Sequence, residues 1–187
     1  MARAKPAKKS SSTGAKDAIA LLKADHREVE DMFEQFEKAR NQDRKQELAA
    51  KICSALKIHT AIEEEIFYPA YLEATDDTET HHEAEIEHAG AKKLIAEIEA
   101  GAADEDYFAA QVKVLSEMIK HHVKEEEGPG GMFSGARDSD MDLEQLGEQL
   151  AARKAELEGE SDEGDDTPPP RGQRERGQPG RMMKSGR

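Results

Sequence analysis

The chain has 187 residues, of which 36% are hydrophobic, 36% charged and 4% aromatic, with a formal net charge of −14. This length suits one domain with terminal extensions, and the shortage of aromatic residues argues against a β-sandwich or β-barrel. One cysteine, Cys53, excludes a disulfide scaffold, and the uncharged runs are too short to cross a bilayer. With no readable secretory signal, we expect a cytoplasmic protein without membrane partners.

Charge divides the chain into three segments. Residues 1–16 carry five basic residues and no acid, residues 17–160 carry 16 basic and 36 acidic residues, and residues 161–187 mix six basic with five acidic residues. The ends lack periodic apolar residues, so we predict disordered tails at 1–16 and 159–187 around a domain at 17–158. Basic tails can contact nucleic acid without specificity, but a body of charge −20 repels a duplex. We predict no specific nucleic-acid partner.

Apolar residues at alternating spacings of three and four predict helices, the first two over residues 17–40 and 43–68. Their boundary signals are Asp17, an N-cap residue, and Pro69, which ends or kinks a helix. In each helix the apolar stripe leaves one core-facing position to a histidine, His26 in the first and His59 in the second. Glu63 lies one turn after His59 on the same side. Polar groups therefore point into the predicted core.

The third predicted helix covers residues 78–100 and the fourth begins near Asp106 and stops at Gly128. His88 occupies the polar slot of the third stripe. On the fourth helix, the stripe register favours His122 and Glu126 as the inward pair. The neighbouring His121 and Glu125 have the same i, i+4 spacing and are the alternative pair.

A fifth, short helix is predicted from about Asp140 to Glu158, with Ser139 and Asp142 as a capping start. Four long helices with short connections predict an all-α fold, an antiparallel up-and-down bundle with the fifth helix packed against one end.

The two predicted hairpins repeat one constellation. His59 follows His26 by 33 residues and His122 follows His88 by 34, and each later histidine precedes a glutamate by four residues. An ionised carboxylate in an apolar core costs several kcal/mol unless it is paired or coordinated. No Lys or Arg occupies a neighbouring stripe position. We therefore predict one metal site whose ligands are His26, His59, Glu63, His88, His122 and Glu126.

Imidazole and carboxylate ligands suit iron, manganese or zinc. Two histidines and one carboxylate per hairpin leave coordination positions open, and carboxylates can bridge two metal ions. A closed tetrahedral zinc site needs only four ligands. These features favour a dinuclear iron centre with an exchangeable position. The alternative is a metal-free helical interaction module whose inward polar groups form a hydrogen-bonded network.

Around these histidines the sequence resembles the hemerythrin-like, or HHE cation-binding, family. The stretches that carry the resemblance are LLKADHREVEDMF, HTAIEEEIFYP, EIEHAGAKKLIAEIE and HHVKEEEGPGGMF. The resemblance covers residues 17–158 and implies a hemerythrin-like four-helix bundle with two oxo- or hydroxo-bridged iron ions. Glu63 and Glu126 are the implied bridges. Manganese or zinc are alternative metals.

The chain departs from the oxygen-carrying hemerythrins of invertebrates, which place a His-x-x-x-His pair on the third helix. Here Lys92 lies four residues after His88 and Ala84 four residues before it. The set is closer to repair-of-iron-centres proteins and to the iron-sensing domain of an F-box ubiquitin ligase. Glu85 is expected to contribute weakly or from outside the ligand set. Three further acids are expected to face solvent, with support of the metal ligands from outside the ligand set as the alternative: Glu64, Glu65 and Glu127.

Bacterial members of the family are linked to oxygen, nitric oxide, peroxide and iron stress. The resemblance therefore implies a protein that binds or senses oxygen, nitric oxide or iron. The alternative is an enzyme-like protein that reduces peroxide or nitric oxide or donates iron to damaged iron–sulfur centres. No separate general acid or base stands out, so turnover would come from the metals. The expected partners are metal ions and a small diatomic or peroxide ligand, and the sequence leaves the oligomeric state open.

Overall fold

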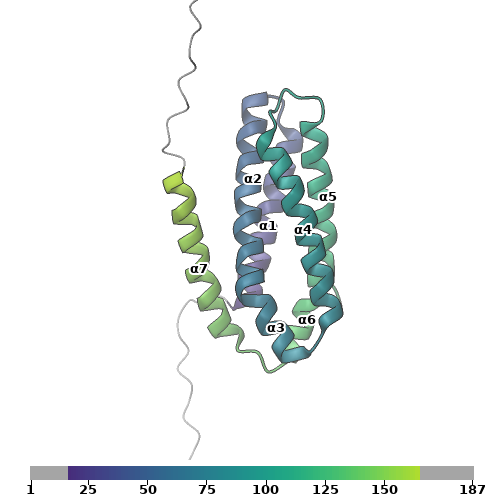
Figure 1. The fold of residues 1–187 in the computed structure, drawn as a ribbon, viewed down its shortest axis with the longest axis vertical. Coiled ribbons are helices and arrows are strands. Elements are labelled where there is room, and N and C mark those ends of the chain that lie inside the picture. Colours follow the sequence, from purple (N-terminus) through teal and green to yellow (C-terminus); the bar gives the residue numbers. More distant parts are fainter. Residues whose placement is uncertain (1–16, 165–187) are drawn as a thin grey trace, which may run out of the picture.

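The structure, a computed structural model, describes residues 17–164, and its regular elements there are helices. The bundle consists of α1 (Ala18–Lys38), α2 (Gln42–Ile62), α4 (Thr78–Ala100) and α5 (Phe108–Glu127). Two short helices, α3 (Tyr68–Thr75) and α6 (Met132–Asp138), close one end, and α7 (Leu143–Gly164) lies outside the bundle (Figure 1). The predicted helical bundle is confirmed. Within this range, no helix combines the length and apolar character needed to cross a membrane.

Polar side chains cap three of the long helices. Asp17, Asn41 and Asp77 each accept a hydrogen bond from the backbone N–H three residues further on, at 2.7, 3.0 and 3.2 Å. These bonds satisfy donors that a helix N-terminus leaves without partners. The predicted cap at Asp17 and the predicted helix over residues 78–100 agree with the structure.

Replacing Asp77 with alanine is expected to lower the free energy of unfolding by about 1 kcal/mol, the usual cost of losing an N-cap. Hydrogen bonds from Thr80 and Tyr71 lower the pKa of Asp77 below its ordinary value of 3.8. Because the folded pKa is the lower one, this stabilisation is complete above pH 3.8 and is lost as the pH falls through the folded value. Urea unfolding of both proteins from about pH 7 downward tests this. A difference that does not shrink in acid would contradict it.

The second predicted helix does not stop at Pro69. It passes through a π-helical segment, η1 (Glu63–Phe67), and continues as α3 to Thr75. Proline has no N–H and its ring clashes with the carbonyl group four residues earlier in a regular α-helix. In the wider π turn, the Tyr68 N–H bonds to the Glu63 carbonyl, five residues back, so that Pro69 falls in the first turn of α3. The π turn begins at Glu63, a predicted site residue.

The C-terminal part also differs from the prediction. Helix α6 was not expected, because Gly128, Gly130 and Gly131 precede it and suggest a loop. Helix α7 begins after Asp142, whose side chain accepts the Gln145 N–H at 3.1 Å, and continues to Gly164, past the predicted boundary. It packs along α1 and α2 instead of against one end. The predicted tails at residues 1–16 and beyond 164 lie outside the described residues.

The core has two apolar clusters separated by a polar layer. One cluster includes Val29, Leu56, Ala91 and Ile119, and the other includes Leu22, Ile62, Ala84 and Met132. On α1, α2 and α4, a histidine lies where the helix passes from one cluster to the other, and on α5 His122 lies beside Val123 at the edge of the first cluster. Apolar side chains therefore enclose the polar layer above and below, and Cys53 is buried in the first cluster as a free thiol.

Candidate metal centre

All six predicted site residues meet in the polar layer, and none is more than 5% exposed. One histidine comes from each bundle helix, Glu126 comes from α5, and Glu63 is the first residue of η1. The side chains of the alternative pair, His121 and Glu125, are 62% and 46% exposed and lie on the outer face of α5. The apolar stripe thus placed the buried pair of this helix in the correct register.

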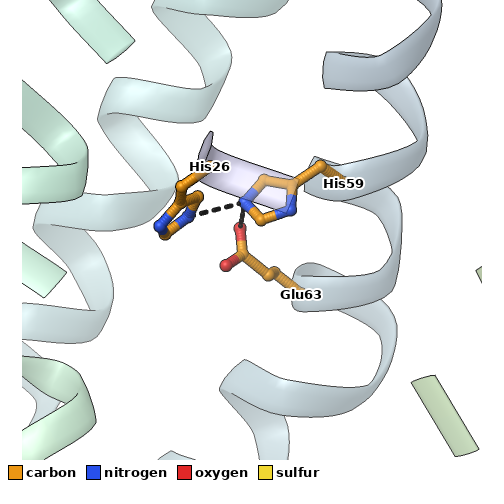
Figure 2. Close-up of side chains that lie close together, drawn as sticks. All are labelled: His26, His59 and Glu63. Atoms are coloured by element: carbon orange, nitrogen blue, oxygen red, sulfur yellow. Dashed lines mark hydrogen bonds and ion pairs between the residues drawn. The ribbon is translucent and has the colours of Figure 1, made fainter. Parts of the chain in front are cut away.

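The four imidazoles form two pairs. His26 Nε2 lies 3.0 Å from His59 Nε2, and His88 Nε2 lies 3.2 Å from His122 Nε2. Figure 2 shows His59 and Glu63 on one continuous helical stretch, both pointing toward His26. The ring nitrogens of each pair therefore face a common point in the core.

The two carboxylates lie between the histidine pairs. Glu63 Oε2 is 3.3 Å from His59 Nε2 and 3.4 Å from His88 Nε2. Glu126 Oε2 is 3.4 Å from His26 Nε2 and 3.6 Å from His122 Nε2. Each glutamate therefore touches one histidine of each pair, which is the position of a bridging ligand between two cations.

Glu63 is completely buried, and neither of its carboxylate oxygens has a hydrogen-bond partner within the described residues. Burial and the nearby charge of Glu126 raise the pKa of Glu63 well above its ordinary value. Burial also acts to raise the pKa of Glu126, but the adjacent His26 and the fields of His122 and His59 outweigh it and lower that pKa. Two buried carboxyl groups this close favour a proton or a cation between them.

Two of the histidines, His59 and His88, are held as neutral donors, whereas at His122 the contact with Glu87 and the charge of Glu126 outweigh burial and raise the pKa. Burial and the proximity of His122 lower the pKa of His88 to about 3, and burial lowers that of His59. A neutral imidazole offers a lone pair on one ring nitrogen when the other nitrogen carries the proton. The Nε2 atoms face the centre, so the site requires the Nδ1–H tautomer.

A carboxylate lies behind each histidine, on the Nδ1 side. Glu127 is 2.8 Å from His26, Glu87 is 2.8 Å from His122, and Glu64 is 3.0 Å from His88. Asp25 lies 3.6 Å from His59 Nδ1. An acceptor at Nδ1 fixes the ring orientation and the tautomer that directs Nε2 toward a metal ion. We call these four acids the outer carboxylates.

Sequence reasoning missed two of the outer carboxylates, Asp25 and Glu87, for which no role was expected. Glu64 and Glu127 were expected to face solvent, with support of the ligands as the alternative, and the structure places both against histidines of the layer. The signal was present, because an acid directly precedes His26 and His88, and a second glutamate directly follows Glu63 and Glu126.

Two other acids lie away from the layer. Glu65 lies on the surface, as predicted, and pairs there with Arg153. Glu85 is exposed and lies 3.7 Å from His81, so the expected contribution of Glu85 to the site has no contact to support it.

Tyr68 also reaches the layer. Its hydroxyl donates to Glu126 Oε1 at 3.1 Å and lies 3.2 Å from His88 Nε2. Burial and the charge of Glu63 raise the pKa of Tyr68 well above its ordinary value, so the phenol keeps its proton. Phe133 stacks on the His26 ring with centroids 5.9 Å apart. Aromatic rings thus close the site on the side of α3 and α6.

The donor atoms form two groups that share Glu63. In the first, atoms of His26, His59 and Glu63 lie within 4.8 Å of one another, and in the second, atoms of Glu63, His88 and His122 do. Two imidazoles and a carboxylate suit a borderline or hard transition metal such as iron, manganese or zinc. The arrangement can therefore hold two cations side by side.

Comparisons with known proteins find one matching family model and a solved structure of similar fold. The family model of the hemerythrin HHE cation-binding domain matches residues 17–129. A crystal structure of a hemerythrin HHE cation-binding domain-containing protein from Mycobacterium kansasii superposes with a TM-score of 0.68 at 23% identity. The superposition covers 78% of this chain and 90% of that one.

One curated relative is a protein named DNA nickase from Nostoc sp. (strain PCC 7120 / SAG 25.82 / UTEX 2576), 25% identical over 140 residues. The match covers 74% of this chain and 39% of the relative, so the chain spans about two fifths of that protein.

Proposed function

Because the chain belongs to the hemerythrin HHE cation-binding family, we propose that its polar layer binds two iron ions bridged by Glu63 and Glu126. The observation that carries this proposal is the completely buried Glu63, whose oxygens lack hydrogen-bond partners within the described residues. Leaving a carboxylate in this state costs several kcal/mol unless a cation or proton compensates. A cation bound by each histidine pair would also relieve the close approach of the two Nε2 atoms within that pair.

Iron is proposed over manganese and zinc because each group supplies two imidazoles and a carboxylate, a set that leaves coordination positions open for a further ligand. When bound, the two ions would supply those open positions and redox chemistry. The chain's own residues orient the imidazoles through the outer carboxylates and enclose the layer in apolar side chains. Manganese is the second metal that this donor set accepts.

We further propose that the centre binds or senses a small ligand such as oxygen or nitric oxide. A cavity of about 10 Å³ lies next to the four histidines and is lined on its other sides mainly by Val29, Leu56, Ile119 and Val123. This volume is near the lower limit for a single water molecule, so a ligand larger than a few atoms would need the helices to move. Its apolar walls favour a small uncharged molecule over an ion.

We do not propose that this chain cleaves DNA. The nickase from Nostoc is matched over only 39% of its length, and residues 17–160 of this chain carry a net charge of −20. Such a charge repels the phosphate backbone that DNA-binding proteins must contact.

The adjacent histidines on α5 give the test. The variant His122→Ala is expected to lose most of the bound iron, because it removes a buried donor, whereas His121→Ala should keep about two ions per chain. Both variants make the same chemical change, one residue apart on the same helix. Iron content after anaerobic loading measures the outcome. Full iron content in His122→Ala would contradict the proposed ligand set.

The type of ligand response needs a second measurement. Stopped-flow mixing of the reduced protein with oxygen, peroxide or nitric oxide should give a reversible optical change. Steady consumption of the added molecule would instead support an enzyme.

A further inference from the structure

Each outer carboxylate lies near a cationic or titratable side chain. For three of them that side chain belongs to the four-helix bundle, and for Asp25 it belongs to α7. Glu127 pairs with Lys23 and Arg27 at 3.0 and 2.6 Å, Glu64 pairs with Lys92 at 2.6 Å, and Glu87 lies 3.5 Å from His121. These partners come from the helices of the bundle. Asp25 pairs with Lys154 at 2.7 Å, and Lys154 belongs to α7.

Asp25 connects Lys154 to the layer. Its side chain is 9% exposed, with Oδ1 accepting from Lys154 Nζ and Oδ2 lying 3.6 Å from His59 Nδ1. Asp25 Oδ2 and His59 Nδ1 are buried and have no hydrogen-bond partner within the described residues. Among the four histidines of the layer, His59 is thus the one whose Nδ1 contact is longer than a hydrogen bond. Lys154 Nζ also lies 3.8 Å from Glu158 of the same helix.

Helix α7 is held on the bundle by contacts apart from Lys154. Leu146 and Leu150 are buried in the second apolar cluster, and Arg153 pairs with Glu65 of η1 at 2.7 Å. The helix runs beside α1 and α2 in Figure 1 and lies beyond residues 17–129, the part matched by the family model. Lys154 is therefore supplied by a helix outside the four-helix bundle.

We infer that Lys154 is a positioning residue through which docked α7 sets the metal affinity of the His26–His59 half of the centre. Lys154 holds Asp25 as a charged acceptor against His59 Nδ1, and that acceptor orients His59 and strengthens its Nε2 as a donor. Within the described residues, the acids at the Nδ1 atoms of His88 and His122 are Glu64 and Glu87, whose ion pairs are with Lys92 and His121 of the bundle. The two ions should therefore bind with different dependence on α7. This inference rests on the proposed function, because it assumes that the layer binds metal.

Cobalt(II) titration of the full metal-free chain tests the inference, with calorimetry for the affinities and the visible spectrum for the coordination. The variant Lys154→Met keeps the aliphatic stem and removes the charge. It is expected to weaken one of two binding steps by about 10–100-fold, the usual effect of losing a group that orients a ligand, and to leave the other step unchanged. Lys154→Arg should restore the weakened step.

Arg153→Met is the matched control, since it removes the neighbouring cation of α7 and its pair with Glu65 without touching Asp25. Both steps should stay unchanged in this variant. In an Asp25→Asn background, Lys154→Met should have no further effect. Circular dichroism of each variant confirms that the helices are formed.

Three results would overturn the inference. If Lys154→Met binds two Co²⁺ ions with unchanged affinity, Lys154 does not act on the centre. Equal losses in Lys154→Met and Arg153→Met would mean that α7 acts only through docking. If the unaltered chain binds no Co²⁺, the proposed function fails together with this inference, and that outcome is distinguishable from the first two.

Discussion

Replacing Glu63 with glutamine is expected to abolish the binding of both metal ions and to make the metal-free protein more stable. Glu63 touches a histidine of each pair, so removing its charge weakens both halves of the centre at once. In the metal-free protein the same carboxylate is completely buried without hydrogen-bond partners in the described part of the chain. Replacing a buried charge by a neutral group of similar volume relieves this cost, on the order of 1–4 kcal/mol.

The gain in stability should depend on pH in a defined direction. The pKa of Glu63 is raised in the folded state, so the carboxyl group costs nothing below its unfolded value of about 4.5. The cost appears as the pH rises above that value, because the unfolded chain loses the proton more readily than the folded chain. Glu63→Gln should therefore stabilise the metal-free protein near neutral pH and have little effect near pH 4.

Glu65→Gln is the matched control, because it makes the same chemical change two residues away at an exposed position. Urea unfolding in the presence of a chelator gives the free energies, and metal analysis gives the stoichiometry. Retention of two ions by Glu63→Gln, or a metal-free variant less stable than the parent at neutral pH, would refute the role assigned to Glu63.

The predictable part of the fold was the part controlled by periodicity within one helix. His26, His88 and His122 each fill a slot in a stripe of apolar residues, and one helix is enough to show that such a slot faces the core. The two hairpins repeat the order of these residues, which is why the convergence of the six groups could be predicted from the sequence. The buried positions of His122 and Glu126 follow from the same register.

The remaining features depend on pairs of helices or on backbone details. Asp25 lies on α1, but the histidine that it faces is on α2, so no single-helix pattern indicates the contact. Sequence rules predict that Pro69 breaks the helix. They do not predict that a π turn beginning at Glu63 accommodates the proline and lets the helix continue. The position of α7 is set by Leu146 and Leu150, whose spacing shows a buried face but not its partner.

The outer carboxylates extend the repeat from the ligands to their supports. In each half, the acid before the first histidine faces the second histidine of its own pair, as with Asp25 and His59 or Glu87 and His122. The glutamate that directly follows Glu63 or Glu126 reaches across to the other hairpin, as Glu64 does to His88 and Glu127 to His26. The centre is thus held by contacts within and between the hairpins, and the pair of Asp25 with Lys154 of α7 is one point at which the two halves differ.

Removing the metal from the unaltered protein is expected to lower its melting temperature strongly. A ligand at 100 times its dissociation constant stabilises the folded state by about 2.7 kcal/mol, so two ions at that excess contribute about 5 kcal/mol. For a domain of this size each kcal/mol corresponds to about 2–4 °C, which gives a decrease of about 10–20 °C. Each ion would also offset the charge of the buried Glu63. Removing the metal should therefore destabilise the polar layer between the two apolar clusters.

Thermal unfolding followed by circular dichroism, with iron under anaerobic conditions and then with excess chelator, measures this difference. Glu63→Gln serves as the control, since a protein that binds no metal should show the same melting temperature in both conditions. The combination separates two effects of one residue: with metal the parent should be the more stable protein, and without metal the variant should be. A parent protein whose melting temperature is indifferent to the chelator would show that its folded core does not depend on cations, and the buried carboxylates would then need protons instead.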